Sequence, residues 1–232
     1  MVSACPGARA RLAKTATLAA MKPWTQKFIE LAREVEALRF GRFELKSGRI
    51  SPYFFNAGRF CDGRSMLGVA ECYADAIVDS GIAFDLVFGP AYKGIPLATA
   101  VSVSLYQRHR INLPVAYNRK EAKGHGEGGV VVGAELKGRV LVVDDVISAG
   151  TAFDQARRLI EQAGAEVAAL AVGLDRQERG TGAVSAGSDL KQRGIELIAV
   201  ARLEDLVANL QADQSAAKLR SAMLEYQSRY GA

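Results

Sequence analysis

The sequence predicts an α/β fold in which helices flank a central parallel sheet. Short apolar runs with strand-like composition occupy 84–89, 113–118, 139–145, 167–175 and 195–203. Helical stretches at 95–109 and 151–164 separate several of these runs. The runs are apolar throughout rather than alternating, which is typical of parallel strands that helices cover on both faces.

The segment before these strands predicts a helix, a hairpin and a second helix. Apolar residues three or four positions apart predict an amphipathic helix over 24–40, which we expect to end at Gly41. The aromatic, alternating stretch that follows carries the turn signal KSGR, so it is expected to form a hairpin. A second helix is expected over 65–81, closed by Gly81, and a last helix over 216–230.

Composition and charge indicate a soluble domain. The 232 residues are 49% hydrophobic and 24% charged, and no apolar run approaches the roughly 18 residues of a membrane span. The net charge of +5 falls to +2 without the three cations of residues 1–20, so we expect neither a nucleic-acid nor a membrane partner. Cys5, Cys61 and Cys72 form no CxxC pair and are expected to be reduced thiols in a cytoplasmic protein.

The first twenty residues differ in character from the rest. They are rich in Ala and Arg and contain no acidic residue, a composition that resembles that of organellar transit peptides. The alternative, which we favour, is a disordered extension upstream of Met21, with residues 21–232 forming one domain.

Three strand ends carry unusual chemistry, and ligands of such sheets bind where strands end. In the first, Asp144 and Asp145 follow the apolar run VLVV, at a strand end that we expect to face solvent. Ser148, Gly150 and Thr151 then precede a helix, whose free N–H groups suit a phosphate. Because carboxylates repel phosphate, we expect the two acids to accept hydrogen bonds from the vicinal hydroxyls of a ribose. The alternative is that one acid caps the helix and the other holds a stray ion.

The second strand end is FDLVFGPAYKGIPLA. Gly89 and Pro90 end the strand, and Lys93 stands just before the next helix. A cation beside free backbone amides there would suit the pyrophosphate arm of the same ligand. The alternative is a solvated surface lysine.

The third strand end is NRKEAKGHGEGGVVVG, which crowds Arg119, Lys120, Lys123 and His125 among glycines. Without a ligand we expect a disordered surface loop. With one, a cationic loop hinged by glycines could close as a lid over pyrophosphate and exclude water.

Two further stretches could recognise a flat, acidic base. Phe54 or Phe55 could stack on a ring, although paired phenylalanines are more often core residues. Arg176, at the end of the run 167–175, could bind a carboxylate through two parallel hydrogen bonds. Its alternative is an ion pair with Asp175, Glu178 or another nearby acid.

Five strings resemble, in order and spacing, the orotate phosphoribosyltransferase family of type I phosphoribosyltransferases. They are KSGRISPYFFN, GPAYKGIP, NRKEAKGHGEGG, VVDDVISAGTA and LDRQERG. The resemblance runs from Met21 to the C-terminus. The VVDD string is specific for the fold but not for the substrate, because purine, pyrimidine and regulatory members share it. The resemblance implies the type I phosphoribosyltransferase fold, with an N-terminal hood made from about residues 21–65 plus C-terminal elements.

By position, the resemblance also implies two sets of binding residues. Phosphoribosyl pyrophosphate (PRPP) would be held by Lys46, Tyr92, Lys93, Arg119, Lys120, Lys123, His125, Asp144, Asp145, Val146, Ile147, Ser148, Ala149, Gly150, Thr151 and Ala152. Orotate would be held by Phe54, Phe55, Ser148 and Arg176. Arg119 resembles a residue that reaches PRPP across a dimer interface. Many family members have Thr where Ser148 stands, so the hydroxyl is kept and a methyl contact is lost.

The implied reaction is the transfer of 5-phosphoribosyl from PRPP to orotate in pyrimidine biosynthesis by a homodimer with a shared active site. Lys123, Asp144 and Asp145 would be the catalytic residues, with Lys123 stabilising the charge of the leaving pyrophosphate. Mg²⁺ would be held mainly by PRPP, with no ligand set supplied directly by the protein.

Two other functions remain open. The chain could use a purine base, although Arg176 and the Phe54–Phe55 pair favour an acidic pyrimidine. It could also be a PRPP-sensing regulator that binds nucleic acid, but such a protein need not keep the lysines of a lid. Phosphate-loop and dinucleotide fingerprints are absent from the sequence, which argues against nucleotide hydrolases and dehydrogenases.

Overall fold

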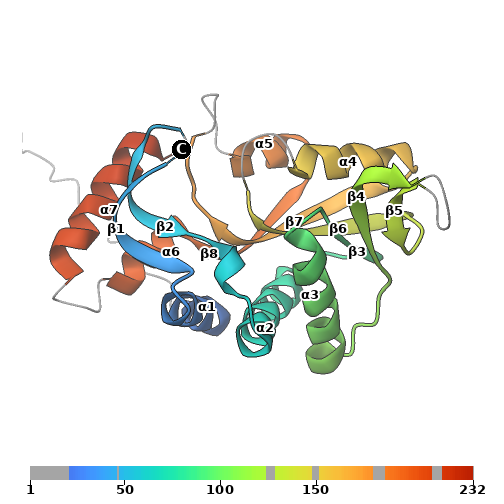
Figure 1. The fold of residues 1–232 in the computed structure, drawn as a ribbon, viewed down its shortest axis with the longest axis horizontal. Helices are drawn as coiled ribbons and strands as arrows, with labels where there is room; N and C mark the ends of the chain where they lie inside the picture. The colour runs from blue at the N-terminus through green and yellow to red at the C-terminus, as the bar shows by residue number, and fades with distance from the viewer. Residues whose placement is uncertain are drawn as a thin grey trace, which may run out of the picture.

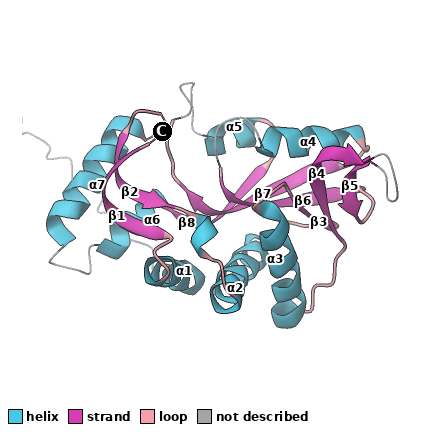
Figure 2. Cartoon of the chain, viewed as in Figure 1, coloured by secondary structure: helices cyan, strands magenta, loops and turns pink. Residues whose placement is uncertain are grey.

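A six-stranded sheet forms the centre of the protein (Figures 1 and 2). The computed structural model describes residues 21–45, 47–123, 129–147, 152–179, 186–210 and 216–231. The strand order is β5-β4-β3-β6-β7-β8. The strands are β3 (Leu86–Gly89), β4 (Val115–Lys123), β5 (Gly129–Gly133), β6 (Arg139–Val146), β7 (Glu166–Asp175) and β8 (Glu196–Arg202). The predicted α/β fold with a mainly parallel sheet is confirmed.

One edge of the sheet departs from the prediction. Strand β5 runs antiparallel to β4, so the sheet is mixed rather than wholly parallel. The expectation of a surface loop over 118–133 is wrong for residues 118–123 and 129–133, which belong to the paired strands β4 and β5. The physical reason is that consecutive valines follow the glycine cluster, and their β-branched side chains favour a strand beside β4.

Helices cover both faces of the sheet (Figure 1). On one face lie α1 (Pro23–Glu34), α2 (Gly63–Ser80) and α3 (Gly94–His109), and on the other lie α4 (Ala152–Gln162) and α5 (Ala186–Gln192). Successive apolar side chains of β6 pack on opposite faces. Val140 and Val142 belong to the core under α4, whereas Leu141 and Val143 belong to the core beside α2 and α3. The apolar strands are therefore buried on both sides, as predicted.

The first helix ends earlier than its sequence pattern suggests. Helix α1 stops at Glu34, and Glu36 takes a left-handed conformation with φ of 56°. The expectation that Gly41 ends this helix is wrong. Gly41 lies inside the next strand, at a point where the pairing with the partner strand is irregular. The apolar spacing continues past the helix because Leu38, which already belongs to a strand, packs in the same core as the helix.

A hairpin and a C-terminal helix pack together beyond the β8 edge of the sheet (Figure 1). The hairpin consists of β1 (Leu38–Glu44) and β2 (Ile50–Phe55), followed by the short helix η1 (Ala57–Arg59). After β8 the chain forms α6 (Leu203–Asn209) and then α7 (Ala217–Tyr230). The rings of Tyr53 and Tyr226 meet edge to face at 6.2 Å, which joins the hairpin to α7. The predicted hairpin and last helix are confirmed, as is Gly81, which ends α2 with φ of 66°.

The strand order places a topological switch between β3 and β6. From β3 the chain proceeds outward to β4, and from β6 it proceeds the other way through β7 to β8. The connections therefore diverge at the carboxyl ends of β3 and β6, which is where open α/β sheets bind their ligands. Among the described residues, no helix is long and apolar enough to span a membrane.

Candidate active site

An ion pair joins the two strand ends at the switch point. Lys93, which stands between β3 and α3, places its Nζ 2.7 Å from Oδ2 of Asp145 at the end of β6. The close approach depends on two glycines, because a Cβ at Gly89 would lie 2.4 Å from the carbonyl oxygen of Gly94, and a Cβ at Gly94 would lie 2.8 Å from that of Val143. The turn after β3 is thereby packed tightly against β6.

The two acids are held firmly and lie deeper than their sequence context suggests. Only 8% of Asp145 is exposed, so its expected place on a solvent-facing strand end is wrong. Asp144 Oδ1 accepts a hydrogen bond from the backbone N–H of Asp145 at 2.9 Å, and its carbonyl oxygen accepts one from the buried Tyr73 hydroxyl at 2.9 Å. The register with β7 agrees with the burial of Asp145, because its neighbours Asp144 and Val146 lie opposite Val172 and Leu174 within the sheet.

The two adjacent carboxyls are electrostatically different. Burial, and next the negative charge of Asp145, raise the pKa of Asp144 to about 7. Asp145 is compensated directly by Lys93. The pair therefore combines one carboxylate that is already ion-paired with one that burial makes a weaker acid.

The end of β4 supports the turn after β3. Asn118, which is buried, accepts a hydrogen bond from the Ala91 N–H through Oδ1 at 3.0 Å. Lys120 Nζ lies 4.6 Å from the ring centroid of Tyr92, a side chain that is 65% exposed. A pocket of about 630 Å³ opens beside this turn, and the charged side chains among its described lining residues are Arg119, Lys120 and Arg158. This corner is consequently cationic.

The next strand end holds Arg176 in a buried polar cluster. Its Nε donates to Glu178 Oε1 at 2.8 Å, and its guanidinium carbon lies 4.9 Å from the ring centroid of Tyr53. The ion pair with Glu178 that was one alternative for Arg176 is thus present. Since β7 runs parallel to β6, Arg176 emerges at the same edge of the sheet as Asp144 and Asp145.

The two phenylalanines lie in different surroundings. The ring of Phe54 packs on Phe43 with centroids 5.6 Å apart and lies 5.7 Å from the guanidinium of Arg39. Phe55 packs on Phe28 and Phe60, with centroids 5.9 and 6.4 Å apart, and so belongs to the core below the hairpin. Both side chains are half-buried, and of the two only Phe55 packs against a core cluster.

Several predicted site residues lie outside the described residues. These are Lys46, His125, Ser148, Ala149, Gly150 and Thr151, together with the side chains of Lys123 and Ala152. The backbone of Lys123 ends β4, opposite Gly129 of β5. Val146 still pairs with β7, opposite Leu174, and Ile147 packs beside the core under α4.

Sequence reasoning missed Tyr73 and Asn118. Asn118 had a detectable signal, because it is a polar residue that closes an apolar run. Tyr73 had none, since it occupies an apolar position of α2 and only the fold brings its hydroxyl to the Asp144 carbonyl.

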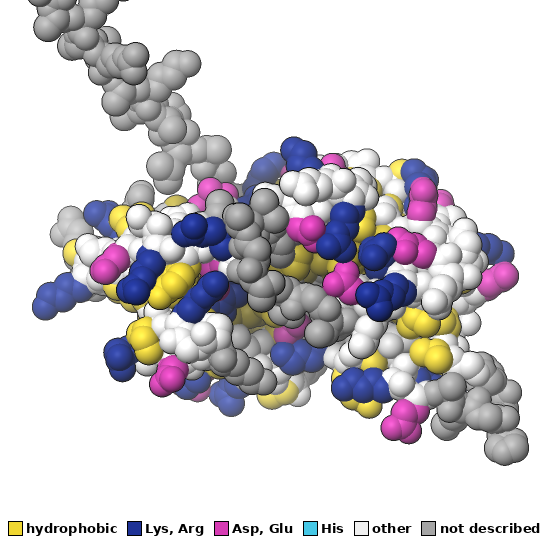
Figure 3. Space-filling model, turned by 90° about the horizontal axis from the view of Figure 1, so that it is seen from above, with side chains coloured by type: hydrophobic (Ala, Val, Ile, Leu, Met, Phe, Trp, Pro, Cys, Tyr) yellow, Lys and Arg dark blue, Asp and Glu magenta, His cyan; other side chains and the backbone are white. Residues whose placement is uncertain are grey.

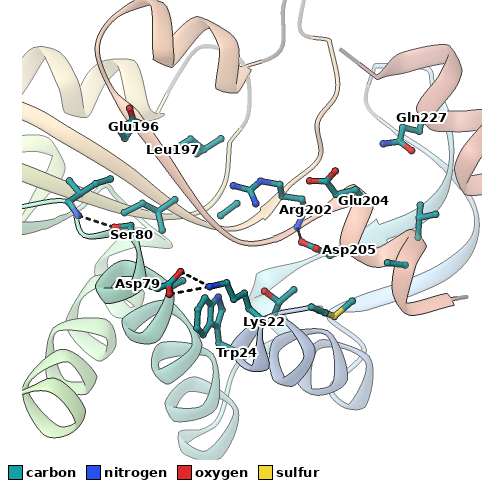
Figure 4. A pocket seen from close by; sticks show the side chains of 18 residues that line it. Lys22, Trp24, Asp79, Ser80, Glu196, Leu197, Arg202, Glu204, Asp205 and Gln227 are labelled. Atoms are coloured by element: carbon teal, nitrogen blue, oxygen red, sulfur yellow. Dashed lines mark hydrogen bonds and ion pairs between the residues drawn. The ribbon is translucent and has the colours of Figure 1, made fainter. Parts of the chain in front are cut away.

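Another pocket, of about 900 Å³, lies along the edge strand β8 between α1, α2 and α6 (Figure 4). Its polar side chains include both charges, and Lys22 is paired with Asp79 at 3.1 Å. Strands β7 and β8 separate this pocket from the β3–β6 switch point, so we locate the active site at the strand ends instead.

Known proteins resemble the chain along most of its length. The family described as "Phosphoribosyl transferase domain" matches residues 62–185. Orotate phosphoribosyltransferases of Shewanella oneidensis and Salmonella agona are each 50% identical over 212 residues, which is 91% of this chain and 99% and 100% of theirs. The crystal structure of orotate phosphoribosyltransferase from Francisella tularensis is similar with a TM-score of 0.81 at 38% identity, covering 88% of this chain and 99% of that one.

Proposed function

The chain belongs to the orotate phosphoribosyltransferases, and from this family membership we propose how its strand ends divide the two substrates. The enzyme transfers 5-phosphoribosyl from PRPP to orotate in pyrimidine biosynthesis, giving orotidine 5′-monophosphate and pyrophosphate. The observation that carries the assignment is the Lys93–Asp145 ion pair across the switch point, with Arg176 at the neighbouring strand end.

PRPP binds over the ends of β3 and β6 in this proposal. Asp144 and Asp145 accept hydrogen bonds from the ribose hydroxyls, and residues 148–151 bind the 5-phosphate. Lys93 bridges the acids and the pyrophosphate, because its side chain is 56% exposed although its Nζ already contacts Asp145. In the homodimer inferred below, the cationic corner with Lys120 and Arg119 attracts the pyrophosphate of the partner's PRPP.

The donor set suits Mg²⁺ that arrives with the substrate. Among the described residues, no three His, Cys, Asp or Glu side chains converge to hold a metal ion. Mg²⁺ commonly keeps few protein ligands and binds phosphate oxygens, so it would be held mainly by PRPP above these strand ends. When bound, the ion would neutralise charge on the leaving pyrophosphate.

Orotate binds beside Arg176. A guanidinium offers two parallel donors to the orotate carboxylate, and Phe54 is available for ring contact. With both substrates in place, the base nitrogen attacks C1 of the ribose as pyrophosphate leaves, so no protein nucleophile is needed. The residues act by positioning the reactants and by stabilising the leaving-group charge, for which Lys123 is the main candidate.

We also infer a cytoplasmic homodimer in which Arg119 and the 119–128 segment reach the partner's PRPP. The inference follows the family resemblance. The free thiols of Cys61 and Cys72 agree with a reducing compartment. Figure 3 shows acidic side chains among the basic ones over the visible face, which favours an enzyme over a nucleic-acid-binding regulator.

The activity is tested by following orotate absorbance with PRPP and Mg²⁺. We expect consumption of orotate that requires both additions, and no turnover when adenine, guanine or hypoxanthine replaces orotate. Turnover of a purine base without orotate consumption would contradict the substrate assignment.

Arg176→Ala is expected to weaken the binding of orotate alone. Losing a charge-assisted hydrogen bond should weaken orotate binding by about 1.5–3 kcal/mol, while PRPP binding stays nearly constant. Separate Kd values by titration calorimetry check this. Equal weakening of both ligands would indicate a structural role for Arg176.

PRPP affinity is expected to rise with pH through about 7, where the pKa of Asp144 lies. Ionised Asp144 accepts from a ribose hydroxyl, whereas protonated Asp144 has lost acceptor capacity. Between pH 6 and 8 the ionised fraction of such a group grows roughly tenfold, and affinity should follow it. Because PRPP itself titrates, the measurement is the difference between wild type and Asp144→Asn. An identical pH profile in the two proteins would contradict the role of Asp144.

A further inference from the structure

We propose that Glu178 is a positioning residue, which orients Arg176 for the orotate carboxylate and ties that orientation to the hairpin β1–β2 and helix α7. The proposal rests on the role of Arg176 in the function proposed above. It concerns a residue that need not touch either substrate.

The Glu178 carboxylate is the centre of a buried polar cluster. Its Oε1 accepts hydrogen bonds from Arg176 Nε at 2.8 Å, from the Tyr226 hydroxyl at 3.0 Å and from the Tyr53 hydroxyl at 3.4 Å. Its Oε2 accepts one from Arg49 Nη1 at 3.2 Å. The Glu178 side chain is 14% exposed, so these donors replace most of the water that a carboxylate would otherwise bind.

The donors come from three segments that are far apart in the sequence. Arg176 follows β7, Arg49 and Tyr53 belong to the hairpin, and Tyr226 belongs to α7. Two hydrogen bonds to backbone carbonyls lie beside them: the Arg179 N–H donates to the Tyr230 carbonyl at 2.9 Å, and the Arg49 side chain donates from Nη2 to the Arg179 carbonyl at 3.1 Å. The position of Arg176 therefore depends on the positions of the hairpin and of α7.

The cluster fixes the guanidinium of Arg176 without using all of its donors. Nε bonds to Glu178, and the guanidinium lies over the Tyr53 ring, so its plane is set by two contacts. The buried Nη2 also lies 2.7 Å from Glu178 Oε1, so Glu178 takes the Nε–Nη2 edge of the guanidinium. The Arg176 side chain remains 19% exposed, and the rest of its guanidinium is the part that can meet a planar carboxylate.

The charge of the cluster also favours an acidic ligand. Arg49 and Arg176 share the single carboxylate of Glu178, which leaves one positive charge in excess beside the fully buried Tyr53. A buried excess charge is costly unless a counter-ion compensates it, and the carboxylate of orotate would do so.

The test is a double-mutant cycle between Glu178 and Arg176 in the orotate-absorbance assay. Glu178→Gln should raise KM for orotate roughly tenfold, as expected from one lost charge-assisted contact, with KM for PRPP unchanged. Glu178→Asp keeps the charge and should restore part of the affinity. In the Arg176→Ala background, Glu178→Gln should change KM for orotate no further, because the residue acts through Arg176.

A milder pair of variants covers the case in which Glu178→Gln does not fold. Tyr226→Phe removes one donor to Glu178, and Tyr230→Phe is its matched control on the same helix, since its ring lies 4.9 Å from that of Tyr226. Only Tyr226→Phe should raise KM for orotate, by about twofold to fivefold.

The outcomes separate the two proposals. If Arg176→Ala leaves KM for orotate unchanged, the proposed function of Arg176 fails. If Arg176→Ala raises that KM but Glu178→Gln raises it further by the same factor in both backgrounds, Arg176 keeps its role and the positioning role of Glu178 is overturned. Equal effects of Tyr226→Phe and Tyr230→Phe would overturn the link to α7.

Discussion

Lys123→Ala is expected to lower kcat by roughly 10²-fold or more, the effect of losing one preorganised charge stabiliser. The KM for PRPP should change far less. Lys123 ends β4 directly before the glycine-rich residues 124–128, and we expect its contact with pyrophosphate to form mainly in the transition state. An interaction made mainly in the transition state lowers kcat when it is removed and leaves ground-state binding nearly intact.

The matched control for this variant is Lys137→Ala. Lys137 is 79% exposed, pairs with Glu135 on the surface and takes no part in the proposed site, so its removal should leave kcat unchanged. A large rise in KM for PRPP with kcat unchanged in Lys123→Ala would instead make Lys123 a simple binding residue.

Hybrid dimers test whether this lysine serves its partner's site. Mixing Lys123→Ala with the Asp144→Asn/Asp145→Asn double variant should generate dimers that contain one intact site, and activity should return. Hybrids confirmed by native mass spectrometry but without activity would place the segment over its own subunit.

The second large effect is expected from Asp144→Asn combined with Asp145→Asn. Two charge-assisted hydrogen bonds to the ribose are lost, each worth about 1.5–3 kcal/mol, so PRPP affinity should fall 10²-fold or more. Calorimetric titration of PRPP with Mg²⁺ measures this. Unchanged affinity in the double variant would refute the ribose assignment.

The single variants of this pair should differ in stability. The folded protein holds a proton on Asp144 between the ordinary carboxyl pKa of 3.8 and about 7, so the charge of Asp144 costs stability as pH rises through that window. Asp144→Asn should accordingly leave the melting temperature at pH 8 unchanged or higher. Asp145→Asn should lower it, because it breaks the contact with Lys93 at a site where Asp145 is buried.

How much the sequence revealed depends on how local each signal was. The strand, acids and helix of 140–160 could be predicted because strand composition, polar strand end and helix pattern all lie within one short stretch. The hairpin and Gly81 followed from turn chemistry for the same reason. The end of α1 could not be predicted, because the periodic apolar pattern continues into a strand whose Leu38 is buried in the same core.

The parts of the site that escaped prediction depend on contacts between distant segments. Tyr73 reaches the Asp144 carbonyl from 71 positions away, and Arg49 reaches Glu178 from 129 positions away. Strand β5 was missed because its glycines suggested a loop, while its pairing with β4 needed the sheet to be in place. Only the fold brings these groups together.

The central claim is that the ends of β3 and β6 hold PRPP while the end of β7 holds orotate. The most direct test is one set of KM values for both substrates, measured in the orotate-absorbance assay on Arg176→Ala and on Asp144→Asn. We predict that KM for orotate rises only in the first variant and KM for PRPP only in the second. A rise of both KM values by similar factors in both variants would contradict the division of the substrates between the two strand ends.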